Sequence, residues 1–355
     1  MTLEIMVAAF STSPMNAGYF FGIGYANGDI AIAKFQQSGV LENTFGDSGI
    51  ELIDLGASSD AGGRVVVQED GLVLFTARKT EIGEFANGVV GRLNPDGTLD
   101  LTFNGTGWLN LDLSNNIDIV VDFALLPNGE VLTAGTVFDE VTLESEIFVL
   151  RLLPNGTYDT AFGINGISKY DIGLGNDNAA KIVLQPDGKA IIGGSANDGN
   201  DDNFCLIRIN EDGSLDPTFG DGGVVITEIS TGYDGIASMA LQPDGKLVVA
   251  GSARMGTNDD IALARYHTGL NLSVNDRDEK PLFSVYPSPA TGYLSISSKV
   301  KLQTIELTDA LGKKVLTVKP NSNQMQLDIA LLPSGIYLLR ATDGQRLYTQ
   351  KLVKE

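Results

Sequence analysis

The feature that most constrains this chain is a segment of nearly 60 residues that recurs in tandem. Its clearest part is an apolar run, an Asp-Gly or Asn-Gly turn and a second apolar run: VVVQEDGLVLFTAR (65–78), FALLPNGEVLTAGT (123–136), IVLQPDGKAIIGGS (182–195) and MALQPDGKLVVAGS (239–252). The turn glycines Gly71, Gly129, Gly188 and Gly245 are spaced by 58, 59 and 57 residues, and Phe45, Phe103, Phe162 and Phe219 keep the same spacing. A period of this size indicates a repeat protein.

Each repeat is predicted to be a small antiparallel sheet. Asp-Gly and Asn-Gly between apolar runs predict tight hairpins, with both central residues at positive φ. A third run such as DIALARY follows, and then a further turn, SLDPTFG and a run such as GGVVITEI, which supply a fourth strand. No part of the repeat has a helical period. Four-stranded units in tandem are typical of the blades of a β-propeller, and a solenoid is the second interpretation.

The whole repeat region is expected to hold about five blades over residues 1–272. The first is read from 5–10, 19–24 and 29–35, and the last loses the pattern after Arg265. Arg265 is the last member of a third recurring position, occupied by Lys34, Arg92, Arg151, Arg208 and Arg265. Imperfect end units are expected where a ring closes or an array is capped.

Composition excludes several classes of function. The net charge is -21, which disfavours nucleic acid, whose affinity comes from neutralised phosphates, and anionic lipid. Cys205 is the one cysteine and His267 the one histidine, so the sequence lacks a disulfide framework and the usual general base. No run reaches the roughly 18–20 apolar residues of a membrane span. Cys205 and Trp108 are best explained by packing, and His267 as a surface residue.

These repeats resemble the delta-60 repeat family, whose units read much like LQPDGKLVVAGS…DIALARYNxDGSLDxTFGxxG. The match is close in four units and covers about residues 1–270. The resemblance implies a bacterial secreted or surface protein with a propeller-like fold, and it carries no catalytic residue with it.

The composition changes sign near residue 280. Residues 281–355 hold nine Lys or Arg against five Asp or Glu, whereas 1–280 hold 15 against 40. The charged stretch 273–280 reads as a linker, and the change marks a second module. Short strand-like runs separated by turns over about 70 residues predict a small immunoglobulin-like β-sandwich for 281–355.

This second module resembles the type A C-terminal sorting domain of the type IX secretion system of Bacteroidota. FSVYPSPATGYLSI, IELTDALGKKVL, LDIALLPSGIYLLRATDGQ and KLVKE carry the resemblance. The matching positions of the motif include Tyr286, Pro287, Pro289, Asp309, Gly312, Lys313, Gly335, Ile336, Tyr337, Lys351, Leu352 and Val353. The resemblance implies that the secretion machinery recognises 281–355 and that the protein is released or held at the outer cell surface.

Such cargo first crosses the inner membrane with an N-terminal signal peptide. The N-terminus has no basic region before its short apolar patch and does not read as a signal peptide. We therefore expect that the N-terminus is incomplete, and that one or more blades could precede it.

Carboxylates are the candidate functional groups of the repeats. Asp60, Asp118, Asp177 and Asp234 recur in register, as do two further acidic sets: Asp54, Asp112, Asp171 and Glu228; and Glu42, Asp100, Asp159 and Asp216. In a closed propeller the first set could form a ring that binds Ca²⁺, which prefers oxygen ligands. The favoured interpretation is structural: the acids accept hydrogen bonds from turn amides or pair with the recurring Lys and Arg across blades, since a buried cation needs a partner.

A second calcium candidate is the loop 197–203, through Asp198, Asn200 and Asp202, although it lacks the EF-hand register and distal Glu. A solvated blade loop is the favoured reading there, and no other cofactor is indicated. The sequence thus favours an extracellular binding or adhesion module, with an unknown ligand such as a glycan, over an enzyme. The alternative is a carboxylate-based glycoside hydrolase or lyase, whose catalytic pair would break the repeat. Here nearly every prominent acid obeys the repeat.

Overall fold

The computed structural model describes residues 6–11, 18–139, 141–142, 144–270, 283–287, 289–309, 313–320, 322–342 and 347–355. Of residues 6–11, 283, 347–349 and 351 it describes only the backbone. The chain divides into two compact units, Met1–Asn271 and Leu272–Glu355. The predicted linker 273–280 and the motif residue Gly312 lie outside the described residues. Within the described part no helix is long and apolar enough to cross a membrane.

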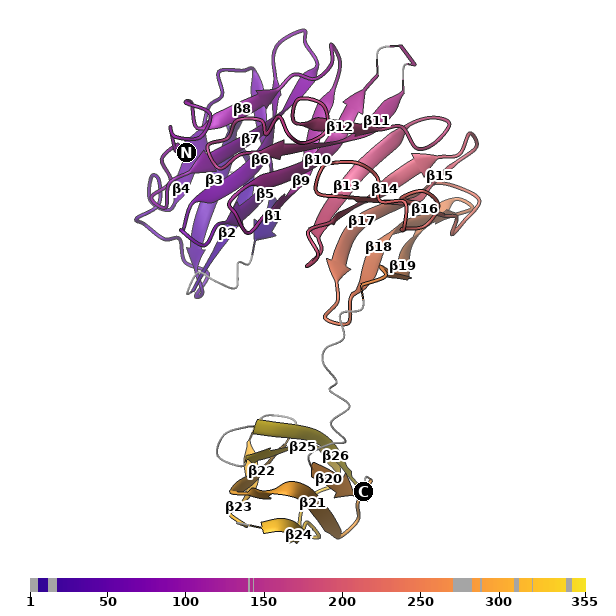
Figure 1. The fold of residues 1–355 in the computed structure, drawn as a ribbon. Helices are drawn as coiled ribbons and strands as arrows, with labels where there is room; N and C mark the ends of the chain where they lie inside the picture. The colour runs from indigo at the N-terminus through magenta and orange to yellow at the C-terminus, as the bar shows by residue number, and fades with distance from the viewer. Residues whose placement is uncertain are drawn as a thin grey trace. The chain divides into compact units, whose positions relative to one another are not determined.

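The first unit consists of antiparallel sheets that follow one another along the chain, as predicted (Figure 1). The first two are β1 (Met6–Ser11), β2 (Tyr19–Ala26), β3 (Asp29–Gln36), β4 (Ile50–Ile53); and β5 (Ser59–Val67), β6 (Val73–Thr80), β7 (Ala86–Leu93), β8 (Trp108–Leu111). The next two are β9 (Asp118–Leu125), β10 (Val131–Phe138), β11 (Ser145–Leu152), β12 (Ile167–Tyr170); and β13 (Asp177–Leu184), β14 (Ala190–Asn197), β15 (Asp202–Ile209), β16 (Val224–Thr227). The last is β17 (Asp234–Leu241), β18 (Lys246–Met255), β19 (Asn258–His267).

These sheets are the five predicted blades, and the fifth has three strands among the described residues. The first strands of neighbouring blades pack on one another, β1 on β5, β9 on β13 and β13 on β17, so they form the inner side of the unit. Because strands within a blade run up and down in chain order, the connections between second and third strands lie at the same end as those that lead to the next blade. We call this end of the blades the loop end, and the opposite end the clamp end.

The hairpins at the clamp end differ in detail from the prediction. The turn glycines have positive φ, at 89° for Gly71 and 86° for Gly188, but the Asp before each does not. Gln68 N donates to Leu72 O at 2.8 Å and Gly71 N to Gln68 O at 3.0 Å, which describes a three-residue loop with glycine alone in the left-handed region. The two-residue turn with both φ positive occurs instead at the loop end of the first blade, at Asn27 (58°) and Gly28 (96°).

Apolar side chains between successive blades build the core of this unit. On β15, Phe204 and Leu206 are buried against Met239, Leu247 and Val249 of the fifth blade. Equivalent clusters lie at the other junctions, because alternation along each strand gives every blade two apolar faces.

The fifth blade leaves one of its faces uncovered. Ile261 and Leu263 on β19 are 88% and 70% exposed, whereas their equivalents Phe204 and Leu206 are buried. Among the described residues, β17–β19 form no extensive packing with β1–β4. The described blades thus form a row of five with four packed junctions.

The second unit is a β-sandwich of two small sheets, as expected. One sheet is β20 (Phe283–Tyr286), β21 (Tyr293–Leu302) and β24 (Ser322–Asp328), and the other is β23 (Lys314–Val318), β22 (Thr304–Asp309), β25 (Gly335–Thr342) and β26 (Leu347–Lys354). Leu294, Ile305, Leu307, Leu339 and Leu352 belong to its core.

Candidate functional site at the loop end of the propeller

The recurring arginines form buried clamps at the clamp end. Arg92 of β7 donates from Nε to Asp100 Oδ2 at 2.7 Å, from Nη2 to Thr102 Oγ1 at 3.2 Å, and from Nη1 to the carbonyl of Pro154 in the next blade at 2.6 Å. Its guanidinium lies 4.9 Å from the centre of the Phe103 ring. The ion pair is therefore formed within one blade, and the contact across blades is to a backbone carbonyl.

The same clamp recurs in the next two blades. Arg151 donates to Asp159 Oδ2 at 2.6 Å and to the carbonyl of Glu211 at 2.7 Å. Arg208 lies 2.8 Å from Asp216 Oδ2 and donates to the carbonyl of Thr268. The repeated Arg, Asp and Phe positions are thus used to join each blade to its successor.

The clamp lowers the pKa of its carboxylates. Burial acts to raise the pKa of Asp216, but hydrogen bonds from Lys189 and Thr218 and the charge of Arg208 outweigh it, so the pKa lies well below its usual range. At Asp100 burial is likewise outweighed by hydrogen bonds from Thr102 and the neighbouring guanidinium. These carboxylates are ionised structural partners, so they are poor candidates for acid or base catalysis.

Turn glycines complete the contact between blades. A Cβ on Gly156 would lie 2.7 Å from the Phe103 ring, and one on Gly213 would lie 2.9 Å from the Phe162 ring. Each glycine also has positive φ. Gly156 and Gly213 lie in the turns after the third strands of their blades, so they are a different set from Gly71, Gly129, Gly188 and Gly245, and each of these two turns packs on the Phe ring of the preceding blade.

The end blades depart from this pattern. Lys34 of the first blade lies 4.6 Å from the Tyr19 ring centre, whereas Glu42 accepts hydrogen bonds from Gln36 and Thr44. In the fifth blade Arg265 is half exposed and pairs with Asp244 at 3.1 Å.

The four aspartates of the predicted ring all lie at the loop end, each in or at the start of the first strand of a blade. Each accepts hydrogen bonds from amides of the connection that precedes it; the closest donors are Leu55 N to Asp60 (2.9 Å), Leu113 N to Asp118 (2.6 Å), Ile172 N to Asp177 (2.6 Å) and Ile229 N to Asp234 (2.7 Å). Among the described residues no three of these four come within 4.8 Å of one another. The structure thus places them one at each junction.

The loop 197–203 holds its polar groups in a local turn. Asp198 Oδ1 accepts hydrogen bonds from the amides of Asn200 and Asp201, which lower the pKa of Asp198. Asp202 instead accepts from Asn197 Nδ2 at 2.6 Å. In the described part the carboxylates of Asp198 and Asp202 do not join a third acidic or metal-binding group.

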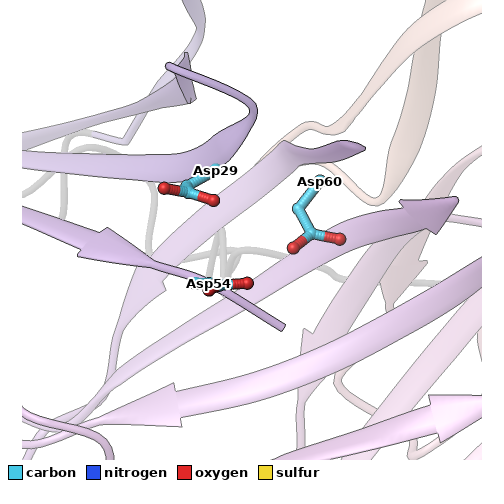
Figure 2. A group of neighbouring side chains, drawn as sticks. All are labelled: Asp29, Asp54 and Asp60. Atoms are coloured by element: carbon cyan, nitrogen blue, oxygen red, sulfur yellow. The ribbon is translucent and has the colours of Figure 1, made fainter. Parts of the chain in front are cut away.

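One group of acids does converge at the loop end. Asp29 at the start of β3, Asp54 directly after β4 and Asp60 in β5 each offer one carboxylate oxygen within 4.8 Å of the others. Figure 2 shows the three side chains turned toward a common space. The sequence analysis placed Asp60 and Asp54 in two separate recurring sets of acids and did not single out Asp29. Asp29 could have been found from the sequence, because the position five residues before each recurring Lys or Arg always bears a side-chain oxygen: Asp29, Asn87, Glu146, Asn203 and Asp260.

Three exposed aromatic side chains also lie at this end, on different blades. Tyr25 precedes the first hairpin turn, Phe85 lies between β6 and β7, and Tyr233 precedes β17; all three are exposed. A cavity of about 350 Å³ beside Phe85 is lined by Asn87, Asp112 and Asn116, among others. The connections between second and third strands differ in length and sequence from blade to blade, whereas those that lead to the next blade keep nearly the same length.

The cysteine, the tryptophan and the histidine considered in the sequence have structural or surface positions. Cys205 is buried, and burial raises the pKa of its thiol to about 12. Trp108 packs against the apolar core between the first and second blades, and its ring centre lies 5.5 Å from Lys79 Nζ. His267 is exposed at the end of β19.

The sorting-motif residues described by the structure lie in β20, at the end of β22, in turns and in the last two strands of the sandwich. Tyr337 is buried and donates to the carbonyl of Pro333 at 2.8 Å, and Leu352 is buried in the core, whereas Tyr286 and Ile336 are exposed. Asp309 Oδ1 accepts from Lys313 N at 2.9 Å. Pro287, Pro289 and Gly335 are exposed, Val353 is half-buried, and Lys351 pairs through its backbone with β25.

The comparisons with known proteins agree with this division of the chain. Residues 284–355 match the family described as secretion system C-terminal sorting domain, and residues 82–103, 185–219 and 242–272 match a domain of unknown function (DUF5122) beta-propeller. No curated protein matches the chain significantly.

Solved structures resemble the chain only distantly. An endo-arabinase from Bacteroides thetaiotaomicron is 13% identical over 70% of this chain and 89% of its own, with a TM-score of 0.39. The polysaccharide lyase Uly1 is 10% identical over 98% and 90%, with a TM-score of 0.43. PorZ, a surface component of the type IX secretion system of Porphyromonas gingivalis, is 12% identical over 96% of this chain and 58% of its own, with a TM-score of 0.26.

The two family matches thus fall on the two units of the fold: the β-propeller unit matches the DUF5122 beta-propeller model over three segments, the β-sandwich matches the C-terminal sorting domain model, and this sorting domain indicates secretion to the outer surface through the type IX system.

Proposed function

We propose that the propeller is an extracellular binding module for a neutral glycan, and that it is not an enzyme. The observation that carries the proposal is the contrast between the two ends of the blades. At the clamp end the recurring residues are engaged in joining blades. At the loop end the connections between second and third strands vary, and Tyr25, Phe85 and Tyr233 are exposed there. Aromatic faces on variable loops over a rigid scaffold suit ligand recognition.

The negative charge of the propeller narrows the class of glycan that we expect it to bind. Residues 1–280 hold 40 Asp or Glu against 15 Lys or Arg, and the loop end carries acids such as Asp112, Asp171 and Asp201. A surface of this sign repels uronate or sulfate groups. We therefore infer an uncharged polysaccharide as the ligand.

A glycan array probed with the full chain tests the proposal. We expect the protein to bind neutral glycans. The substitution Phe85→Ala should weaken this binding about tenfold or more, as for an aromatic anchor that the ligand covers. Leu101→Ala is the matched control, because Leu101 is an exposed apolar residue at the clamp end. Equal binding by the Phe85 variant and the parent would contradict the placement of the site.

The second candidate function is carboxylate-based hydrolysis or elimination of a glycan. The observation in its favour is that Asp29, Asp54 and Asp60 come together at the loop end, since glycosidases act with a pair of carboxyl groups; their oxygens, within 4.8 Å of one another, lie closer than the roughly 5–10 Å of such a pair. Turnover of any polysaccharide by the parent protein, lost in Asp29→Asn, would establish it and overturn the binding-only proposal.

The sorting unit acts, in this proposal, as the part that the secretion machinery contacts. Residues 281–355 fused behind a signal peptide and a reporter should carry the reporter to the surface of a cell that has the type IX system. A reporter that stays in the periplasm would refute an autonomous sorting signal.

A further inference from the structure

We infer that Asp29, Asp54 and Asp60 bind one Ca²⁺ at the junction of the first and second blades. Asp29 and Asp54 belong to the first blade and Asp60 to the second, and Figure 2 shows their carboxylates facing a common space. The inference does not depend on which ligand the propeller recognises.

The spacing of the three carboxylates suits a hard cation. Ca²⁺ holds oxygen ligands at about 2.3–2.6 Å, so oxygens on opposite sides of one ion lie about 5 Å apart. The three oxygens here lie within 4.8 Å of one another. A set made only of oxygens favours Ca²⁺ over the softer transition metals, and water can complete its six to eight ligands.

An unsatisfied buried atom is the second observation that points to an ion. Asp60 is 1% exposed; its Oδ2 accepts from Leu55 N at 2.9 Å, and in the described part its Oδ1 has no hydrogen-bond partner. A buried carboxylate oxygen without a donor is costly. A cation bound there would satisfy it.

Two of the three equivalent junctions show how this atom is satisfied elsewhere. The Ser114 hydroxyl donates to Asp118 Oδ1 at 2.9 Å, and the Ser230 hydroxyl donates to Asp234 Oδ1 at 2.6 Å. At the first junction the same register position is Gly56, which has no hydroxyl to donate.

The local charge is not balanced by the protein. The negative charges of Asp54 and Asp29 act on the buried Asp60, and the positive charge of Lys79 opposes them. Lys79 Nζ is itself paired with Glu81 at 3.0 Å. The side-chain carboxylate of Asp29 accepts no hydrogen bond from the part of the chain that the structure describes, although its backbone pairs with Ala26. Three carboxylates held this close call for a positive ion between them.

The site is expected in a single copy. The register equivalents at the other junctions are Asn87, Asp112 and Asp118; Glu146, Asp171 and Asp177; and Asn203, Glu228 and Asp234. Asp177 Oδ1 also lacks a donor, but within the described residues Glu146 and Asp171 do not converge on it within 4.8 Å.

Calorimetric titration of the full-length, EDTA-treated protein with CaCl₂ tests the inference. We expect one Ca²⁺ per chain, a higher melting temperature by Trp108 fluorescence when it is bound, and at least tenfold weaker binding of Mg²⁺. Asp54→Asn should lose the binding and the shift. Asp112→Asn, the equivalent exposed position at the next junction, should keep both.

Asp54 is exposed, and an asparagine can still accept the hydrogen bond from Gly56 N, so the variant is expected to fold. Asp29→Asn provides a second variant should its circular dichroism differ from the parent. Absence of Ca²⁺ binding by the parent, binding retained in both variants, or loss in Asp112→Asn would each overturn the assignment. Equal affinity for Mg²⁺ would overturn the choice of ion.

Discussion

The clamp between blades yields the sharpest prediction, through the variant Arg92→Met. The substitution keeps an apolar stem but removes the guanidinium that contacts Asp100, Thr102 and the carbonyl of Pro154. Asp100 is 6% exposed, so the variant leaves a buried carboxylate without its cation. Breaking a buried ion pair on one side costs about 3–5 kcal/mol, so the free energy of unfolding should fall by that amount.

Arg265→Met is the matched control from the same register position. Arg265 and Asp244 are both about half exposed at 50% and 44%, and such pairs contribute about 0–1 kcal/mol. Urea unfolding followed by fluorescence measures both variants, and the one tryptophan, Trp108, makes the signal specific to the propeller. A loss below about 1 kcal/mol for Arg92→Met, or an equal loss for the two variants, would refute the reasoning that burial decides the strength of the clamp.

Three further predictions follow from the packing. The folded pKa of Asp216 is lower than the unfolded value of about 4, so the stabilisation that this carboxylate contributes is complete above about pH 4 and is lost as the pH falls through the folded pKa. Urea unfolding from pH 7 to 2 should show this loss of stability, and Asp216→Asn should reduce it. Parallel pH curves for the parent and the variant would contradict the prediction. Gly156→Ala places a Cβ 2.7 Å from the Phe103 ring at a positive φ, so it should lower the free energy of unfolding by about 1–3 kcal/mol, and an unchanged Trp108 transition would count against the contact. Leu352→Asp should unfold the sandwich, seen by loss of protection in hydrogen exchange over 283–355, while the Trp108 transition stays in place; coupled loss of both would show that the units are not independent.

Much of the fold could be predicted because the period makes it visible. Turn glycines and apolar runs repeat in register, and antiparallel hairpins follow from local turn chemistry. The loss of the pattern after Arg265 likewise indicated an imperfect last blade, which has three strands in the described part. The sandwich was expected from the short strand-like runs and turns of residues 281–355, and the change in charge marked where it begins.

The partners of the acids could not be predicted in the same way. The carboxylates equivalent to Asp100 lie eight positions after the recurring Arg of the same blade. Whether the Arg and the carboxylate of one blade face each other depends on the path of the connection between them. The Asp60-type residues were ambiguous between a ring and amide acceptors, because both readings need the same period. Asp29 joins Asp54 and Asp60 only through the packing of two blades, and that contact depends on three-dimensional geometry.

The direction of the clamp has a consequence for how such arrays evolve. Arg92, Arg151 and Arg208 each hold a carbonyl of the blade that follows, so the three junctions from the second blade to the fifth are each made by one copy of the repeat presenting the same groups to another. A duplicated gene segment of one period would therefore bring its own interface with it. Changes in the number of copies need no compensating substitutions elsewhere, while the connections at the opposite end remain free to diverge.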